Sequence, residues 1–332
     1  PGVFGPGQLP VSVILERNVD SMSTAKNKSG TAKGKRSRLY WTVPAVLVAA
    51  VLVVLLAKWA VGLPGVQSFL AEYPGHSELP EGAPVGFPAW LGWQHFLNAF
   101  LLLLIIRTGW QVRTTTRPGG YWTRNNKGLI KTKTPPTKIS LELWFHLTLD
   151  ALWVLNGVVF AVLLFATGQW MRIVPTSWDV FPNALSAALQ YASLNWPTEN
   201  GWVNYNALQL LAYFVTVFIA APLSFITGLR MSAAWPKKAA ALNRAFPIEA
   251  ARAIHFPVMI YFVAFIVVHV FLVLATGALR NLNHMYAASD DAGWAGFWIF
   301  AASVAVMVAA WFLARPLFLR PIASLMGKVT SR

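Results

Sequence analysis

The chain has 332 residues, of which 56% are hydrophobic and only 12% are charged, against about 25% charged residues in a typical soluble domain, so an ordinary soluble protein is excluded. The net charge of +15 does not indicate nucleic-acid binding, because the basic residues lie between long apolar runs, where they act as topology signals. There is no cysteine, which excludes cysteine-ligated iron–sulfur clusters, covalently attached c-type haem and disulfides.

The chain begins with residues 1–39, which we expect to form a disordered basic tail. Residues 22–38 are rich in Lys, Ser, Gly and Thr and contain nothing to bury. Met22 begins a segment typical of a natural start, so residues 1–21 are left out of the interpretation of the fold.

Six apolar runs follow, each long enough to cross a bilayer as a helix of about 20 residues. They cover 40–62, 89–112, 142–169, 207–230, 253–277 and 293–315. Trp and Tyr cluster at their ends, as expected at membrane interfaces. We therefore predict an all-α integral membrane helical bundle with six transmembrane helices. The long connection 170–206 contains a segment at 181–189 that predicts a short helix on the outer surface.

The distribution of Lys and Arg predicts the orientation of the chain. Basic residues gather before the first helix, in loops 113–140 and 231–252, and in the C-terminal tail, while the three alternate loops are acidic on balance. By the positive-inside rule both termini face the cytoplasm.

Four of the six histidines lie in predicted helices. His255 and His269 are 14 residues apart on one helix, so they face nearly the same direction with a rise of about 21 Å between them. His95 lies at the depth of His269, near the outer face, and His146 lies at the depth of His255, near the inner face. Paired imidazoles at two levels predict two b-type haems, His95–His269 outer and His146–His255 inner.

A single histidine in a membrane helix is more often a polar contact between helices than a ligand. Four histidines at matched depths favour ligation, because ionisable groups at depth are costly and mark function. His76 and His284 lie in outer loops, and we expect both to be solvated.

These features resemble the di-haem cytochrome b subunits of membrane dehydrogenases, such as the gamma subunit of formate dehydrogenase and the cytochrome b of nickel–iron hydrogenases. The resemblance covers about residues 88–280 and rests on His95, His146 and the segment His255-Phe-Pro-Val…Val-Val-His269. It implies a four-helix di-haem core in the bacterial cytoplasmic (inner) membrane. Helix 40–62 is added before this core, and segment 293–332, the sixth transmembrane helix and cytoplasmic tail, follows it.

The same resemblance implies that a soluble iron–sulfur or molybdenum-containing subunit exchanges electrons with the core and that membrane quinone meets it near the outer haem. The extra helix 40–62 makes the core enter the membrane from the side opposite to that in the family. We therefore expect the soluble redox partner to be cytoplasmic and to dock on the basic loops 113–140 and 231–252.

Other polar residues in the bundle are candidates for supporting roles. Asp150 lies one turn after His146 and is a candidate to orient its imidazole or relay protons, with a simple structural pairing as the alternative. Asn98 is a candidate to bind haem or quinone, although a helix–helix contact is favoured. Haem propionates seek arginine, and snorkelling to the interface is the alternative for each candidate. The inner candidates are Arg252, Arg107 and Arg230, and Arg280 is the best outer one.

We interpret the chain as a membrane-anchoring electron-transfer subunit of an oxidoreductase complex, without a catalytic acid or nucleophile of its own. Two alternatives stay open. One is a stand-alone transmembrane cytochrome b reductase, and the other is a proton-coupled transporter whose histidines carry protons. Inverted repeats and interrupted helices, which are typical of transporters, are not evident in the sequence. The sequence leaves open the donor, the quinone type and whether the chain forms an oligomer.

Overall fold

A computed structural model describes residues 30–127, 135–196, 200–236 and 238–331. The chain divides into two units, of which the first comprises Pro1–Gln67 with Ala192–Asn195. Within this unit helix α2 (Gly30–Val61) contains the first predicted transmembrane segment, and α3 (Pro64–Glu72) begins. Because α2 begins at Gly30, the predicted disorder is wrong for residues 30–39, where Lys, Arg and Ala favour a helix. The prediction for residues 1–29 lies outside the described residues.

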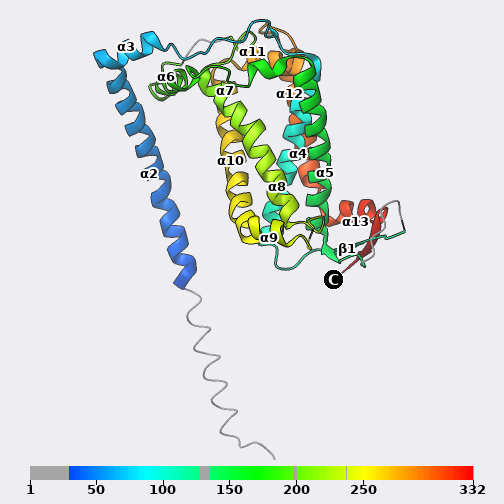
Figure 1. Ribbon diagram of the computed structural model, residues 1–332. Helices are drawn as coiled ribbons and strands as arrows, with labels where there is room; N and C mark the ends of the chain where they lie inside the picture. The colour runs from blue at the N-terminus through cyan, green and yellow to red at the C-terminus, as the bar shows by residue number, and fades with distance from the viewer. Residues whose placement is uncertain (1–29, 128–134, 197–199, 237, 332) are drawn as a thin grey trace, which may run out of the picture. The chain divides into compact units, whose positions relative to one another are not determined.

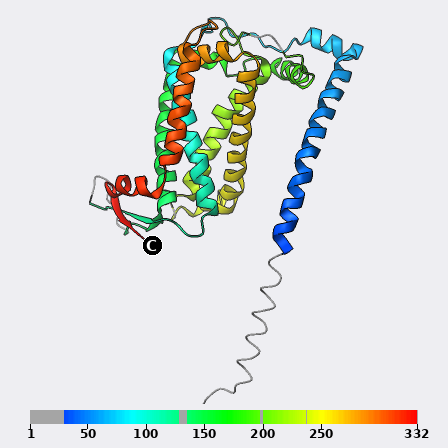
Figure 2. The same cartoon turned by 180° about the vertical axis from the view of Figure 1, so that it is seen from behind.

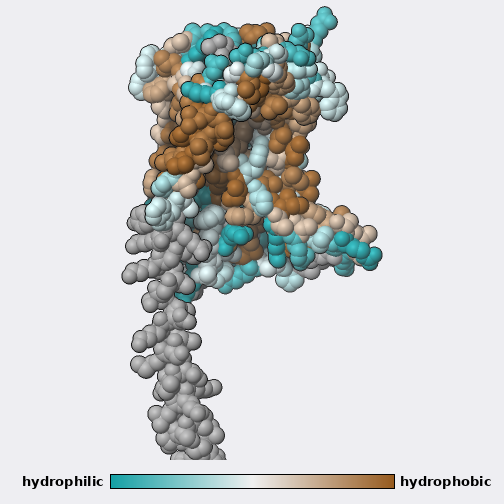
Figure 3. Space-filling view, turned by 90° about the vertical axis from the view of Figure 1, so that its left-hand side faces the viewer, coloured by the Kyte–Doolittle hydropathy of each residue, from teal (hydrophilic) through white to brown (hydrophobic). Residues whose placement is uncertain are grey.

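The six predicted transmembrane helices are confirmed by length and composition. They are Trp41–Val61, Ala89–Thr114, Leu141–Ala166, Ala207–Met231, Ile248–Ala275 and Ala295–Leu313. On the face seen in Figure 3, hydrophobic residues occupy the middle and hydrophilic residues gather at both ends. This pattern is typical of a helical bundle whose sides are solvated by lipid.

Five of these helices run alongside one another in the second unit (Figures 1 and 2). They are α4 (Ala89–Thr114), α5 (Leu141–Ala166), α10 (Ile248–Ala275), α12 (Ala295–Leu313) and the span Ala207–Met231. That span contains α7 (Ala207–Phe214), a π-helix η2 (Val215–Ala220) and α8 (Ala221–Met231). Helix α4 packs against α5 and α12, and α10 packs against α8.

One end of this bundle, here named the sheet end, carries a small antiparallel sheet with strand order β2-β1-β3. The strands are β1 (Tyr121–Arg124), β2 (Ile139–Ser140) and β3 (Gly327–Thr330), and Tyr121 pairs with both Ser140 and Thr330. Helices α9 (Ala240–Ala245) and α13 (Pro316–Ser324) lie at the same end. The C-terminal strand β3 therefore pairs with β1, which belongs to the connection after α4.

The opposite end, here named the α6 end, carries η1 (Gln169–Arg172), α6 (Val180–Ala192), α11 (Ala278–Leu282) and the π-helix η3 (Asn283–Ala287). Helix α6 confirms the short helix predicted in the long connection. Glycine allows the backbones to approach closely here, because a Cβ at Gly296 would clash with the carbonyl group of Leu282.

An apolar layer crosses the middle of the bundle. Phe262 on α10 is only 3% exposed and forms a buried cluster with Ala220 and Val258. Leu102 and Ile106 of α4 pack against this cluster. Trp153 of α5 meets the edge of the Phe262 ring, with 6.4 Å between ring centroids. This layer separates the polar groups at the sheet end from those at the α6 end.

Candidate functional site

The first candidate site lies toward the α6 end, where α4 and α10 bring His95 and His269 together. Their ring centroids are 6.2 Å apart and their planes are inclined by 48°. Tyr286 of η3 meets the His95 ring edge-on, and Phe265 stacks on His269. The pairing predicted from depth is therefore present in the structure.

The spacing of this pair leaves room for one metal ion. Metal–imidazole bonds of about 2 Å on both sides of an ion, with about 1 Å from each nitrogen to its ring centre, place the centroids about 6 Å apart. His95 Nδ1 is also buried without a hydrogen-bond partner. Buried polar atoms are normally satisfied, so an orphaned imidazole nitrogen beside a second imidazole fits a ligand-binding position.

The second candidate site lies toward the sheet end, where His146 of α5 and His255 of α10 are near enough to interact electrostatically. Each ring contacts a Thr-Gly pair on a neighbouring helix. Thr108 Oγ1 lies 2.9 Å from His146 Nδ1, and Thr227 Oγ1 lies 2.8 Å from His255 Nδ1. A Cβ at the adjacent Gly109 would lie 3.2 Å from His146 Cε1, so the ring packs directly on this glycine.

The contacts of the two threonines indicate which nitrogen of each imidazole carries the proton. The Thr108 hydroxyl donates to the Leu104 carbonyl at 2.8 Å, and the Thr227 hydroxyl donates to the Leu223 carbonyl at 2.6 Å. Each hydroxyl has one proton, so it accepts a hydrogen bond from the histidine Nδ1–H. The lone pair of each Nε2 is then available for a metal, and a metal-ligating histidine normally donates its other ring N–H in this way.

Among the described residues no cluster of three or more His, Asp or Glu side chains placed to hold a metal ion occurs.

Asp150 and Asn98 lie near the two sites but differ in their contacts. Asp150 Oδ2 lies 3.6 Å from His146 Nε2, which is beyond a hydrogen bond and on the side away from Thr108. Asp150 was a candidate to orient the His146 imidazole, and the structure shows this hydrogen bond made by Thr108, at Nδ1. Asn98 donates to the Gln94 carbonyl at 2.9 Å within its own helix.

The arginine candidates are in four different situations. Arg107 Nη1 is buried without a hydrogen-bond partner, and its guanidinium lies over Trp311. Arg230 donates to the Phe246 carbonyl at 2.6 Å. Arg252 is exposed, and Arg280 forms an ion pair with an exposed acid, Asp290, at 2.8 Å. Of the four, Arg107 has an unused buried donor that suits an anionic group.

His284 corrects one expectation. It was predicted to be a solvated loop residue, but only 4% of it is exposed, because η3 buries it against Phe87 and Trp202. Its Nε2 lies 2.7 Å from Asp290. Burial lowers the pKa of His284, although hydrogen bonding to Asp290 acts in the opposite direction. His76 is exposed, as expected.

Sequence reasoning did not identify Thr108 and Thr227, nor several buried polar atoms between α4 and α5. Gln94 Oε1, Trp153 Nε1 and Asn156 Nδ2 are all buried without hydrogen-bond partners. A Thr-Gly pair on each partner helix was the only signal for the threonines. The unpaired atoms show that the bundle interior has polar capacity that its own side chains do not use.

Comparison with known families gives one match. A family model described as prokaryotic cytochrome b561 matches residues 86–288, which is more than half of the chain and includes all four paired histidines. No curated protein and no solved structure matches the chain.

Proposed function

Because this chain belongs to the prokaryotic cytochrome b561 family, it is a membrane haem protein of electron transfer, and we propose that it holds two b-type haems and connects a soluble redox subunit with membrane quinone. The observation that supports this most strongly is that His95 and His269 face each other toward one end of the bundle, while His146 and His255 lie near enough to interact electrostatically toward the other end. In this proposal the chain is an electron-transfer subunit and has no catalytic acid or nucleophile.

His95 and His269 would hold one haem, and His146 and His255 the other. Haem iron would supply reversible one-electron chemistry, and with two histidine ligands it would leave no position for a substrate. The remaining task of the chain is to fix the ligands, exclude water and separate the two levels. Buried Phe262 lies between His255 and His269 along α10 and supplies an apolar layer for this separation.

Arg107 is the strongest candidate for holding a propionate at the sheet end, because its buried Nη1 has no partner. Arg230 and Arg252 are nearby candidates in the chain, but one is bonded to a carbonyl and the other is exposed. At the α6 end Arg280 would have to exchange Asp290 for a propionate. Asp150 and Asn98 would act beside the haems through their polar side chains rather than as iron ligands.

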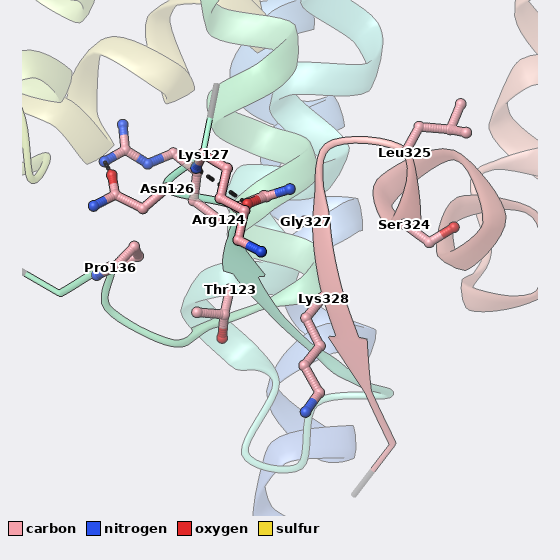
Figure 4. A pocket seen from close by; sticks show the side chains of 10 residues that line it. Thr123, Arg124, Asn126, Lys127, Pro136, Ser324, Leu325, Gly327 and Lys328 are labelled. Atoms are coloured by element: carbon pink, nitrogen blue, oxygen red, sulfur yellow. Dashed lines mark hydrogen bonds between the residues drawn. The ribbon is translucent and has the colours of Figure 1, made fainter. Parts of the chain in front are cut away.

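The soluble partner would dock at the sheet end. A hollow of about 580 Å³ opens there, and Arg124, Lys127 and Lys328 are among its lining residues (Figure 4). Strand β3 thus adds the C-terminal Lys328 to the basic loop 113–140. Complementary charge steers association, so the partner should present an acidic surface.

The orientation follows from the basic residues. With the sheet end in the cytoplasm, both termini are cytoplasmic, and the His95–His269 site lies near the outer face of the bacterial inner membrane, where quinone would meet the chain. A reporter fused within loop 113–140 should be active only in the cytoplasm. An extracytoplasmic reporter would contradict the orientation and with it the cytoplasmic partner.

The experiment that tests the proposal is a reduced-minus-oxidised visible spectrum of the purified full-length chain, combined with haem quantification. We expect two b-type haems per chain and their reduction by a quinol or by the co-purified partner. A colourless protein would refute the haem proposal and favour a transporter. A chain that turns over a small soluble donor without a partner would instead be a stand-alone reductase.

A further inference from the structure

We propose that Thr108 and Thr227 give the sheet-end haem the lower midpoint potential of the two, so that electrons run from the sheet end to the α6 end. This inference rests on the proposed function, because it requires both haems. It assigns the threonines as positioning residues that act through the histidines.

The two sites differ in how their imidazoles are hydrogen-bonded. At the sheet end both Nδ1–H groups donate to threonine oxygens, at 2.9 Å for His146 and 2.8 Å for His255. Within the described part of the chain no hydrogen bond reaches the rings of His95 or His269, which instead contact the aromatic rings of Tyr286, Phe265 and Tyr213.

This difference predicts the order of the potentials. An imidazole that donates its distal N–H becomes a more basic ligand. A more basic ligand stabilises the ferric iron, which carries one more positive charge, more than it stabilises the ferrous iron. The haem held by two such ligands is therefore the harder one to reduce. The apolar rings around His95 and His269 give no corresponding support to the ferric state at the α6 end.

The order of the potentials sets the direction of flow. The sheet-end iron is oxidised from ferrous to ferric as the α6-end iron is reduced from ferric to ferrous, and no proton moves in this step. A donor bound at the basic sheet end would transfer electrons to the low-potential haem, and an acceptor at the α6 end would take electrons from the high-potential haem.

The test is a potentiometric titration of the visible spectrum of the full-length chain with single substitutions. Thr108→Val and Thr227→Val keep the side-chain shape but remove the acceptor for Nδ1–H. Each should raise the potential of the lower component, by about 59 mV if the preference for ferric over ferrous iron weakens tenfold. Thr108→Ser should restore it. Thr148→Val is the matched control, because Thr148 bonds only to the Trp144 carbonyl in its own helix.

A second measurement assigns the components. In a His95→Ala background only the sheet-end haem keeps two ligands, and the low-potential component should remain and should still respond to Thr108→Val. A shift confined to the high component, no shift from either valine variant, or loss of the haem without a shift would overturn the inference. The presence of two haems in the wild-type spectrum would leave the proposed function standing in each of these cases.

Discussion

Pairwise removal of the four histidines should reveal which imidazoles share a haem. Four ligands can pair in three ways, and the 6.2 Å spacing of His95 and His269 selects one of them. Replacing either of these two by alanine should abolish one low-spin bis-imidazole haem and leave about half of the low-spin signal. Replacing both should remove no more than either single change, because the two substitutions destroy the same site.

A double change across the two sites should behave differently. His95→Ala combined with His146→Ala, or with His255→Ala, should abolish the low-spin signal, because each substitution destroys a different site. The assay is low-temperature electron paramagnetic resonance of the oxidised protein, which separates low-spin from high-spin haem, with His76→Ala as an exposed-histidine control. If either cross-site double variant kept half of the signal while the His95/His269 double variant lost all of it, the pairing would be wrong.

Three further predictions concern individual contacts. Gly109→Ala should push the His146 ring aside and weaken sheet-end haem binding about tenfold in a haem-retention assay, whereas Gly157→Ala, where a Cβ meets nothing within 4 Å, should have no effect. Arg172→Met should lower the free energy of unfolding by about 3 kcal/mol in thermal denaturation. The substitution removes two charge-assisted hydrogen bonds to backbone carbonyls, at 2.5 and 2.6 Å, each contributing about 1.5 kcal/mol. An unchanged Tm would show that these bonds are not stabilising. Burial lowers the pKa of His284 below the value of about 6.5 that it has in the unfolded chain. The folded protein should therefore lose stability as the pH falls below about 6.5. A His284→Gln variant that lost stability just as steeply with falling pH in thermal scans would contradict this prediction.

The helices were predictable because they depend on local periodicity, and the approach of His95 to His269 was predictable because the helix order places both residues at the same depth. The apolar runs gave the six transmembrane segments, and the 14-residue spacing on α10 placed His255 and His269 at opposite ends of the same helix. The resemblance to di-haem cytochromes b agrees with the family match over residues 86–288.

The hydrogen bonds from the histidines were not predictable in the same way. The pair Thr-Gly occurs four times, and at two of these positions it ends a helix, with Thr167 closing α5 and Thr276 closing α10. Only the packing of α4 against α5 and of α8 against α10 identifies Thr108 and Thr227 as the two that meet a histidine. Sequence spacing carries no information about this contact between helices.

Long-range pairing explains the other omissions. Strand β3 comes from a segment predicted only as a basic tail, and it forms a sheet because it meets β1, about 200 residues earlier in the chain. His284 was misjudged because its burial depends on Phe87 and Trp202, which come from distant segments.

The π-helix η2 lets α8 keep its rotation about the helix axis although the chain carries one additional residue there. A π-helical turn accommodates an extra residue within a continuous helix, so deleting one residue from Val215–Ala220 should convert η2 to regular α-helix and leave α8 facing as before. Thr227 would then still face His255. The same deletion in the first turn of α8 has no wide turn to absorb it, so it would rotate Thr227 by about 100° relative to the helix before it. A one-residue deletion in η2 should therefore be tolerated better than one at the start of α8.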